Sequence, residues 1–166
     1  MLMRPVQSGL TLPETMISLA VLVTTLAVTL PSAASWLRDL QVRTAAESLK
    51  SGIELARLEA VRRNARISLR IPGDDGRLWA FGCDVPECPK VLQSAPAGEA
   101  SRASLAPQSD PPSSPPPNRI LFDGLGQVGA DAAASSVDSI TITAAGSDRQ
   151  LVLRVSRAGA VTVGGS

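Results

Sequence analysis

Residues 10–34 read LTLPETMISLAVLVTTLAVTLPSAA, and this stretch decides the fold because it carries a single charge, Glu14. A helix crosses a lipid bilayer with about 20 apolar residues, so the stretch is long enough to do so. The residues before it, MLMRPVQSG, carry Arg4 and the amino terminus as positive charges. By the positive-inside rule this end stays in the cytoplasm, and we expect the remainder of the chain to be exported.

Three kinds of segment fit the apolar run itself. It could be a cleavable secretory signal peptide with Ser32 and Ala34 ahead of the cut, a plain membrane anchor, or a buried core helix. None of the three explains Glu14, because a carboxylate in hydrocarbon costs about 2.5–3.5 kcal/mol at mid-membrane and less near an end. A charge in such a place usually meets a partner, so Glu14 is a candidate recognition residue.

Beyond Pro31 the pattern becomes amphipathic. Apolar residues recur every three or four positions, at Val42, Ala45, Leu49, Ile53, Ala56 and Ala60. This spacing predicts one buried face of a helix, with charged residues such as Arg57 on the solvated face. The whole helix is expected over residues 13–64, with a bend or local melting at Pro31, where one backbone hydrogen bond is lost.

The pattern after residue 66 is typical of β-strands. Residues 67–71 alternate, and the turn PGDDGR leads into LWAFG, which predicts a β-hairpin. Further strands are predicted at residues 119–122, 139–143, 150–155 and 160–163. Gly124, Gly126 and Gly129 match the G-x-G-x-x-G template, but the next strand follows too soon for the helix of a dinucleotide site. We therefore interpret FDGLGQVG as a turn, and the fold class as α+β.

Composition argues against an enzyme. The chain has 16 Lys and Arg against 15 Asp and Glu, and it contains neither His nor Tyr, so the commonest general base and metal ligand are missing. Two cysteines without histidine cannot complete a four-ligand zinc site. We expect no catalytic residue, no metal and no cofactor.

Cys83 and Cys88 are the two cysteines. In an exported domain they are expected to form a loop-closing disulfide, worth about 2 kcal/mol by chain entropy. The alternative is a redox-active pair, which usually has the tighter Cys-x-x-Cys spacing. Residues 94–117 hold 7 of the 13 prolines and few large apolar groups, so they are expected to form a mobile surface loop.

The residues from Gly9 to Glu14, GLTLPE, resemble the type IV prepilin signature. The resemblance implies that a prepilin peptidase cuts between Gly9 and Leu10, that Leu10 becomes N-methylated, and that Glu14 serves subunit assembly as the fifth mature residue. Leu10 and Pro13 depart from the usual phenylalanine and aliphatic residue. A proline is tolerated in a first helical turn, where its missing N–H has no helical partner.

Residues 35–66 narrow the resemblance, because they contain an ARxEAxxRN stretch formed by Ala56, Arg57, Glu59, Ala60, Arg63 and Asn64. This stretch and the FxGxG-like turn FDGLGQVG are similar to the GspH/FimT group of pseudopilins and minor pilins. The implied fold is type IV pilin-like, with a long N-terminal helix packed on an antiparallel β domain. The implied segments are a leader (1–9), a transmembrane half-helix (10–34), an amphipathic half-helix (35–66) and a periplasmic β domain (67–166).

The resemblance implies a minor pilin or pseudopilin of a type IV pilus or a type II secretion system, helping to initiate or cap a fibre. Its expected partners are other pilins or pseudopilins, the prepilin peptidase and the inner-membrane assembly platform. The expected location is the inner membrane, with one membrane pass and a periplasmic C-terminal domain, before assembly into the fibre. Which of the two machines it serves stays open.

The alternative function is that of a FimT-like DNA receptor in natural transformation. Those relatives carry a Gly-Arg-x-Arg motif, and the corresponding residues here are Gly159, Ala160, Val161 and Thr162. Arg154 and Arg157 lie just upstream and are the alternative DNA contacts. Because both motif arginines are missing, nucleic acid is not an expected partner.

Overall fold

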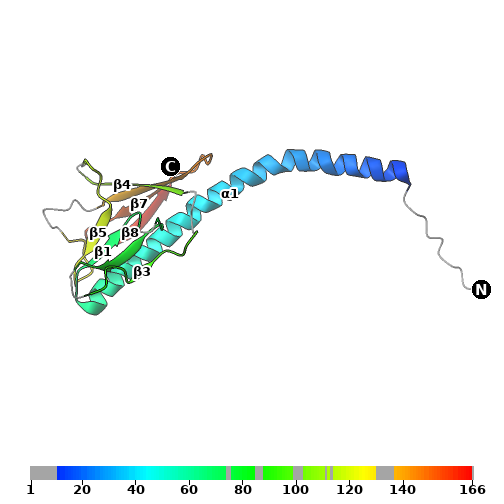
Figure 1. Ribbon diagram of the computed structural model, residues 1–166. Helices are drawn as coiled ribbons and strands as arrows, with labels where there is room; N and C mark the ends of the chain where they lie inside the picture. Colours follow the sequence, from blue (N-terminus) through cyan, green and yellow to red (C-terminus); the bar gives the residue numbers. More distant parts are fainter. Residues whose placement is uncertain are drawn as a thin grey trace, which may run out of the picture. The chain divides into compact units, whose positions relative to one another are not determined.

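A long helix, α1 (Leu12–Arg63), precedes eight strands in the described part of the chain (Figure 1). The computed structural model describes residues 11–73, 76–84, 88–98, 103–110, 112, 114–129 and 137–165, without the side chains of residues 28–33. The helix predicted over residues 13–64 is confirmed to within one residue at each end. The local melting considered at Pro31 does not occur, because helical hydrogen bonds on both sides outweigh the one that proline removes.

The chain divides into two compact units, Met1–Trp36 and Leu37–Ser166. In the first unit the structure describes one element, the first half of α1. The second unit holds the remainder of α1 and all of the strands.

The strands of the second unit form two antiparallel sheets. Sheet A has the order β3-β2-β1-β5, with β1 (Ile67–Arg70), β2 (Ala80–Cys83), β3 (Gln93–Ser94) and β5 (Arg119–Phe122). Sheet B has the order β4-β6-β7-β8, with β4 (Ala103–Gln108), β6 (Ser139–Ala144), β7 (Leu151–Val155) and β8 (Val161–Gly165). The α+β class and the hairpin of β1 and β2 are confirmed.

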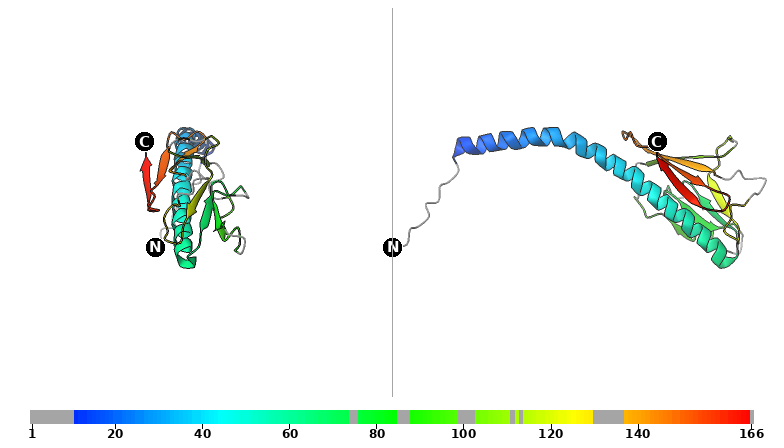
Figure 2. Two further views of the ribbon diagram at one scale, coloured as in Figure 1. Left: turned by 90° about the vertical axis from the view of Figure 1, so that its left-hand side faces the viewer. Right: turned by 180° about the vertical axis from the view of Figure 1, so that it is seen from behind.

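The core of the second unit lies between the second half of α1 and both sheets. In the left view of Figure 2, the orange and red strands of sheet B lie to one side of the helix and the green strands of sheet A to the other. The predicted stripe is confirmed, since six helix residues are fully buried: Val42, Ala45, Leu49, Ile53, Ala56 and Ala60. They pack with apolar residues of both sheets, which include Ile67, Leu69, Ile140 and Leu153.

Trp79, just before β2, lies flat against the helix at Gly52. A Cβ at position 52 would lie 2.6 Å from the Trp79 ring, closer than any carbon contact allows. The indole N–H donates to Ser48 Oγ at 3.1 Å, and the ring stacks on Phe81 with 5.9 Å between centroids. Glycine is therefore required at position 52 by the close approach of the ring, despite its low helix propensity.

The end of α1 is fixed by Asn64. Its φ of 48° is left-handed, and the Ala65 N–H donates to the Ala60 carbonyl at 3.1 Å, which is the six-to-one bond of a Schellman ending. Asparagine tolerates this conformation better than other residues with a Cβ. The chain can then reverse directly into β1.

A closed turn at residues 123–127 follows β5. The Asp123 carboxylate accepts bonds from the N–H groups of Leu125 and Gln127, each at 2.9 Å, and Gly126 has a φ of 74°. Phe122 and Val128 then form an isolated bridge. The interpretation of FDGLGQVG as a turn is confirmed.

The structure differs from prediction in the proline-rich stretch at residues 94–117. Six of its residues form β4, which pairs with β6 along its whole length. The composition hid an alternation in which Ala103 and Leu105 pack against the core. Pro107 is compatible with β4 because β4 is an edge strand of its sheet.

Replacing Gly52 by alanine tests the contact with Trp79. Alanine gains about 1 kcal/mol of helix propensity, but the overpacked ring costs about 1–3 kcal/mol, so we expect a net loss of unfolding free energy of about 1 kcal/mol. Denaturant unfolding followed by tryptophan fluorescence measures it. Ser51→Ala, at an exposed neighbouring position, is the control and should not destabilise the fold. A stabilised Gly52→Ala protein would contradict the contact.

Candidate functional site

Glu14 lies in the first turn of α1, on the exposed surface of the first unit. Its Oε2 accepts a weak hydrogen bond from the Thr11 N–H at 3.4 Å. A carboxylate in the first turn also favours the helix through the partial positive charge of its N-terminus. Glu14 therefore has a local role at the start of the helix, separate from the role in assembly that the sequence predicts. The predicted cleavage site, Gly9 and Leu10, lies outside the described residues.

The first half of α1 exposes an apolar surface. Its large exposed side chains are Leu12, Met16, Ile17, Leu19, Val21, Leu22, Val23 and Leu26, with exposed fractions of 47–74%. The hydroxyl groups of Thr15, Ser18 and Thr24 donate to helix carbonyls three or four residues earlier, so they do not depend on water. A helix that is apolar all round is normally covered by protein or lipid.

Among the residues that the structure describes, no helix meets the combined requirements of length and apolarity for crossing a membrane.

In the second unit, Arg57 joins α1 to two turns. Its Nε donates to the Gly126 carbonyl at 3.1 Å, and a Cβ at Gly159 would lie 3.0 Å from the Arg57 side chain and 2.5 Å from that carbonyl oxygen. The Val128 N–H in turn donates to the Arg157 carbonyl at 2.9 Å. The prediction that Arg57 lies on the solvated face is wrong, because its guanidinium is half-buried where the turns meet.

A second set of polar contacts holds α1 near the start of this unit. The Ser147 hydroxyl donates to Asp39 Oδ1 at 2.6 Å, and Arg149 Nε lies 3.6 Å from Asp39 Oδ2. Arg38 also donates to the Gly146 carbonyl, at 3.2 Å. The helix is thereby fixed to the turn between β6 and β7, in addition to its buried stripe.

Glu59 is the centre of a charged cluster at the end of α1. Its carboxylate accepts hydrogen bonds from Arg62, at 2.6 and 2.9 Å, and from Arg63 Nε at 2.5 Å. These bonds, first from Arg62 and then from Arg63, lower the pKa of Glu59 to about 2, so the carboxylate stays ionised. Glu59 in turn raises the pKa of Arg62.

A groove of 310 Å³ adjoins this cluster, between α1 and the strands β2 and β3. Its apolar lining comes from Leu55, Leu58, Phe81 and Leu92, and its polar lining from Glu59, Arg62, Arg63 and Gln93. Leu55 and Leu58 are the exposed apolar residues of this lining, and exposed apolar groups beside charged ones suit contact with another protein.

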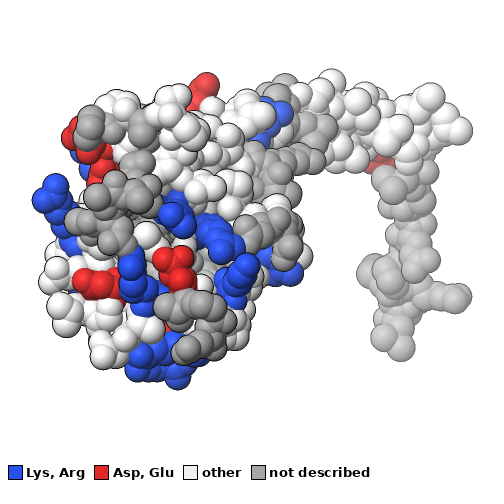
Figure 3. All heavy atoms as spheres, turned by 60° about the vertical axis from the view of Figure 1, so that its left-hand side comes forward, with Lys and Arg blue, Asp and Glu red and all other residues white. Residues whose placement is uncertain are grey.

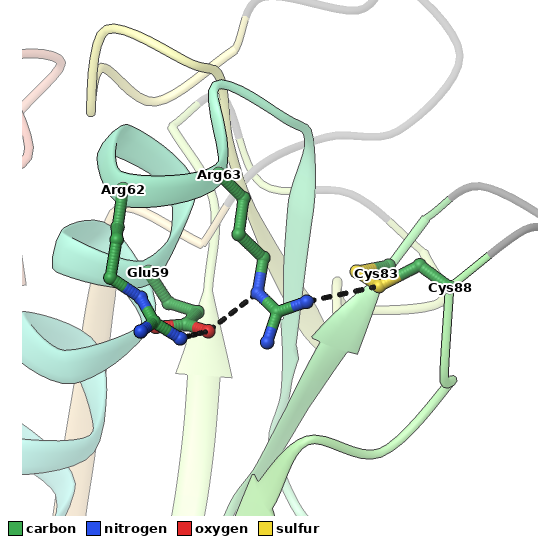
Figure 4. Close-up of a disulfide and its surroundings, with 5 residues drawn as sticks. All are labelled: Glu59, Arg62, Arg63, Cys83 and Cys88. Atoms are coloured by element: carbon green, nitrogen blue, oxygen red, sulfur yellow. Dashed lines mark hydrogen bonds and ion pairs between the residues drawn. A yellow bond between two sulfur atoms is a disulfide. The ribbon is translucent and has the colours of Figure 1, made fainter.

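Cys83 and Cys88 are joined by a disulfide, as predicted. The disulfide closes a short loop after β2, and Arg63 Nη1 lies 3.9 Å from Cys88 Sγ (Figure 4). In the described residues no group of three or more His, Cys, Asp and Glu side chains could hold a metal ion.

The alternative DNA contacts are exposed but are not brought together by one element. Arg154 lies on β7, opposite Thr162 of β8, and Arg157 lies in the turn between these strands. On the face of the second unit that Figure 3 draws, Lys and Arg side chains are interspersed with acidic ones. Mixed charge of this kind differs from the continuous basic surface that phosphate binding favours.

Comparison with known proteins finds a matching family and solved structures with the same fold. A family model described as "Type II transport protein GspH" matches residues 45–159. Two crystal forms of the type IV minor pilin FimU from Pseudomonas aeruginosa PAO1 share the fold. The first has 20% identity and a TM-score of 0.55, covering 74% of this chain and 87% of FimU. The second has 19% identity and a TM-score of 0.51, covering 74% and 91%. No curated protein sequence matches the chain significantly.

The lowered pKa of Glu59 predicts a pH dependence. Such a group stabilises the fold fully above its ordinary pKa of 4.5, and this contribution is lost as pH falls through about 2. The difference in melting temperature between wild type and Glu59→Gln should therefore be largest near neutral pH and shrink between pH 4.5 and 2. Glu54→Gln is the control, because its exposed pair with Lys50 at 3.8 Å contributes little. A difference that is independent of pH would contradict the assignment.

Proposed function

Because the chain belongs to the GspH family of type II transport proteins, we propose that it is a pilin-like fibre subunit. It serves either as a pseudopilin of a type II secretion system or as a minor pilin of a type IV pilus, and it helps to initiate or cap the fibre. Its role is structural and includes no chemistry of its own.

One observation carries this proposal: α1 is a single helix with two different surfaces. Its second half buries a stripe in the core of the second unit, whereas the side chains described in its first half are exposed and largely apolar. Burying an aliphatic side chain is worth about 1.5–3 kcal/mol, so the exposed half gains from any apolar cover. Neighbouring subunits supply that cover in a fibre, and lipid supplies it beforehand.

We place the chain in the inner membrane before assembly, with the second unit in the periplasm. The apolar run at residues 10–34 and the positive residues before it support this location. The prepilin peptidase removes residues 1–9 and exposes the amine of Leu10, which is then methylated. The assembly platform and other pilins or pseudopilins are the further partners.

Glu14 is the recognition charge of the assembled state. Packed among apolar helices, its carboxylate would be costly unless it met a cation, and the amine of Leu10 of a neighbouring subunit is the nearest chemical match. The attraction is stronger there than in water because the effective dielectric is low.

Processing is tested with Gly9→Val, which places a branched side chain at the scissile bond. We expect the wild-type protein, expressed with a prepilin peptidase, to begin at Leu10, and the variant to keep Met1. Intact-mass and N-terminal peptide mass spectrometry measure both. A mature chain that begins at Ser35 would instead identify a cleaved secretory signal peptide and overturn the prepilin assignment.

Two substitutions at Glu14 separate its charge from its local hydrogen bond. Glu14→Gln keeps an acceptor for the Thr11 N–H and removes the charge, whereas Glu14→Ala removes both. We expect both variants to enter the membrane at the wild-type level and to enter isolated fibres about tenfold less, which corresponds to about 1.4 kcal/mol.

Immunoblots of membrane and fibre fractions measure these amounts. Glu47→Gln, at an exposed position of the second half of α1, is the control for loss of one negative charge. If Glu14→Gln assembled as well as wild type, the role of Glu14 would be local and the proposed intersubunit pair would be wrong.

A further inference from the structure

The two sulfur atoms of the disulfide lie in different surroundings. Cys83 belongs to β2, pairs with Ile67 of β1 and is 4% exposed, within the core. Cys88 is half-buried and packs against the edge of that core. In the reduced protein, an oxidant in solution would therefore reach Cys88 first.

A cation stands beside the accessible sulfur. Arg63 Nη1 lies 3.9 Å from Cys88 Sγ, and the same guanidinium is held by Glu59 through its Nε (Figure 4). In the reduced protein, a positive charge at this distance favours a thiolate at Cys88, whereas the burial of Cys83 disfavours a charged sulfur there.

Other charged groups lie near the two cysteines in the structure or in the sequence. Glu59 is shared by Arg62 and Arg63, so the cluster carries a net charge of +1 at neutral pH. Asp84 directly follows β2, in the loop that the disulfide closes. Lys90 lies two residues after Cys88. Glu87, next to Cys88 in the sequence, lies outside the described residues. Of the charged groups described here, Arg63 contacts a sulfur atom, with its Nη1 3.9 Å from Cys88 Sγ.

We propose that Cys88 is the nucleophilic cysteine through which this domain exchanges disulfides with an external disulfide oxidant, that Cys83 is the resolving cysteine, and that Arg63 activates Cys88. The Cys88 thiolate attacks one sulfur of the oxidant, whose S–S bond breaks and releases its other sulfur as a thiolate. Cys83 then loses its proton and attacks Cys88 Sγ. The mixed disulfide breaks, and the second oxidant sulfur leaves as a thiolate. Two cysteine thiols are oxidised, one oxidant disulfide is reduced, and the two protons pass to the released thiolates.

The geometry couples this reaction to folding. Arg63 belongs to the last turn of α1, 25 residues before Cys88, so it reaches the sulfur when the helix end is docked beside β2. The chain that follows Cys88 also packs closely against β2, since a Cβ at Gly82 would overlap the Lys90 carbonyl. Oxidation is therefore faster in the docked chain than in an undocked one. This inference concerns the second unit and does not rest on the proposed function.

The test uses full-length protein reduced with dithiothreitol, freed of reductant and mixed with glutathione disulfide at pH 7. Cys83→Ala leaves the proposed nucleophile and Cys88→Ala leaves the proposed resolving thiol. Mass spectrometry follows the mixed disulfide, which we expect to form at least about tenfold faster in Cys83→Ala. Equal rates, or a faster Cys88→Ala protein, would overturn the assignment of the nucleophile.

The role of Arg63 is tested in the Cys83→Ala background. Arg63→Gln should raise the thiol pKa by about one unit, which the absorbance of the thiolate at 240 nm measures. The exchange at pH 7 should slow about threefold, because the smaller thiolate fraction is partly offset by the greater nucleophilicity of each thiolate. Arg63→Lys should restore most of the shift. Arg62→Gln is the matched control, because Arg62 binds the same carboxylate without a contact to sulfur.

Circular dichroism melts show whether each variant is folded under the assay conditions. If a folded Arg63→Gln protein has the same thiol pKa and rate as the Arg62→Gln protein, Arg63 does not activate Cys88 and that part of the inference is wrong.

Discussion

The buried stripe of α1 is the interaction on which the rest of the second unit depends. Its six residues are inaccessible to solvent and make contact with both sheets. Three of them are alanines, at positions 45, 56 and 60, so the strands can approach the helix closely. Each sheet has four strands and, taken alone, would leave one apolar face in water. The helix covers the inner faces of both and makes one core of them. Polar contacts from Arg57 and Asp39 then set the position of the helix along the sheets.

The first half of the same helix has apolar side chains that the core of the second unit does not cover. The core cluster contains no residue from the described side chains of the first half of α1. Hydroxyl groups there bond to the helix itself, so the surface offers few polar groups to water. The large apolar side chains described there are exposed, so this surface would gain from apolar cover by another molecule. This division of one helix between an internal and an external partner is the physical basis of our functional proposal.

Most of the fold followed from hydrophobic periodicity. The stripe of α1, the hairpin at β1 and β2 and the later strands were predicted because burial imposes a period of 3.6 or 2 on apolar residues. β4 was missed because its serine and proline composition outweighed the alternation of Ala103 and Leu105. The half-buried place of Arg57 was missed because periodicity cannot show that a charged residue meets a carbonyl in a distant turn. Of the candidate site, the disulfide is confirmed. The partner that we propose for Glu14 would belong to another subunit, so that role stays a prediction.

The ARxEAxxRN stretch and the FDGLGQVG turn are two halves of one contact. Asn64 ends the helix with a positive φ, and a Cβ at Gly124 would lie 2.4 Å from Asn64 Oδ1. About two helical turns before Asn64, Arg57 donates to the carbonyl of Gly126. The turn therefore needs glycine at position 124 for space and at position 126 for its left-handed backbone. The motif needs asparagine to stop the helix and arginine to reach the turn.

Glu59, on another side of the helix, binds Arg62 and Arg63 and so holds the Arg63 guanidinium near the disulfide. The ARxEAxxRN stretch thus contacts the FDGLGQVG turn through Arg57 and holds Arg63 beside Cys88 through Glu59. Both are possible because residues two positions apart on a helix point in different directions.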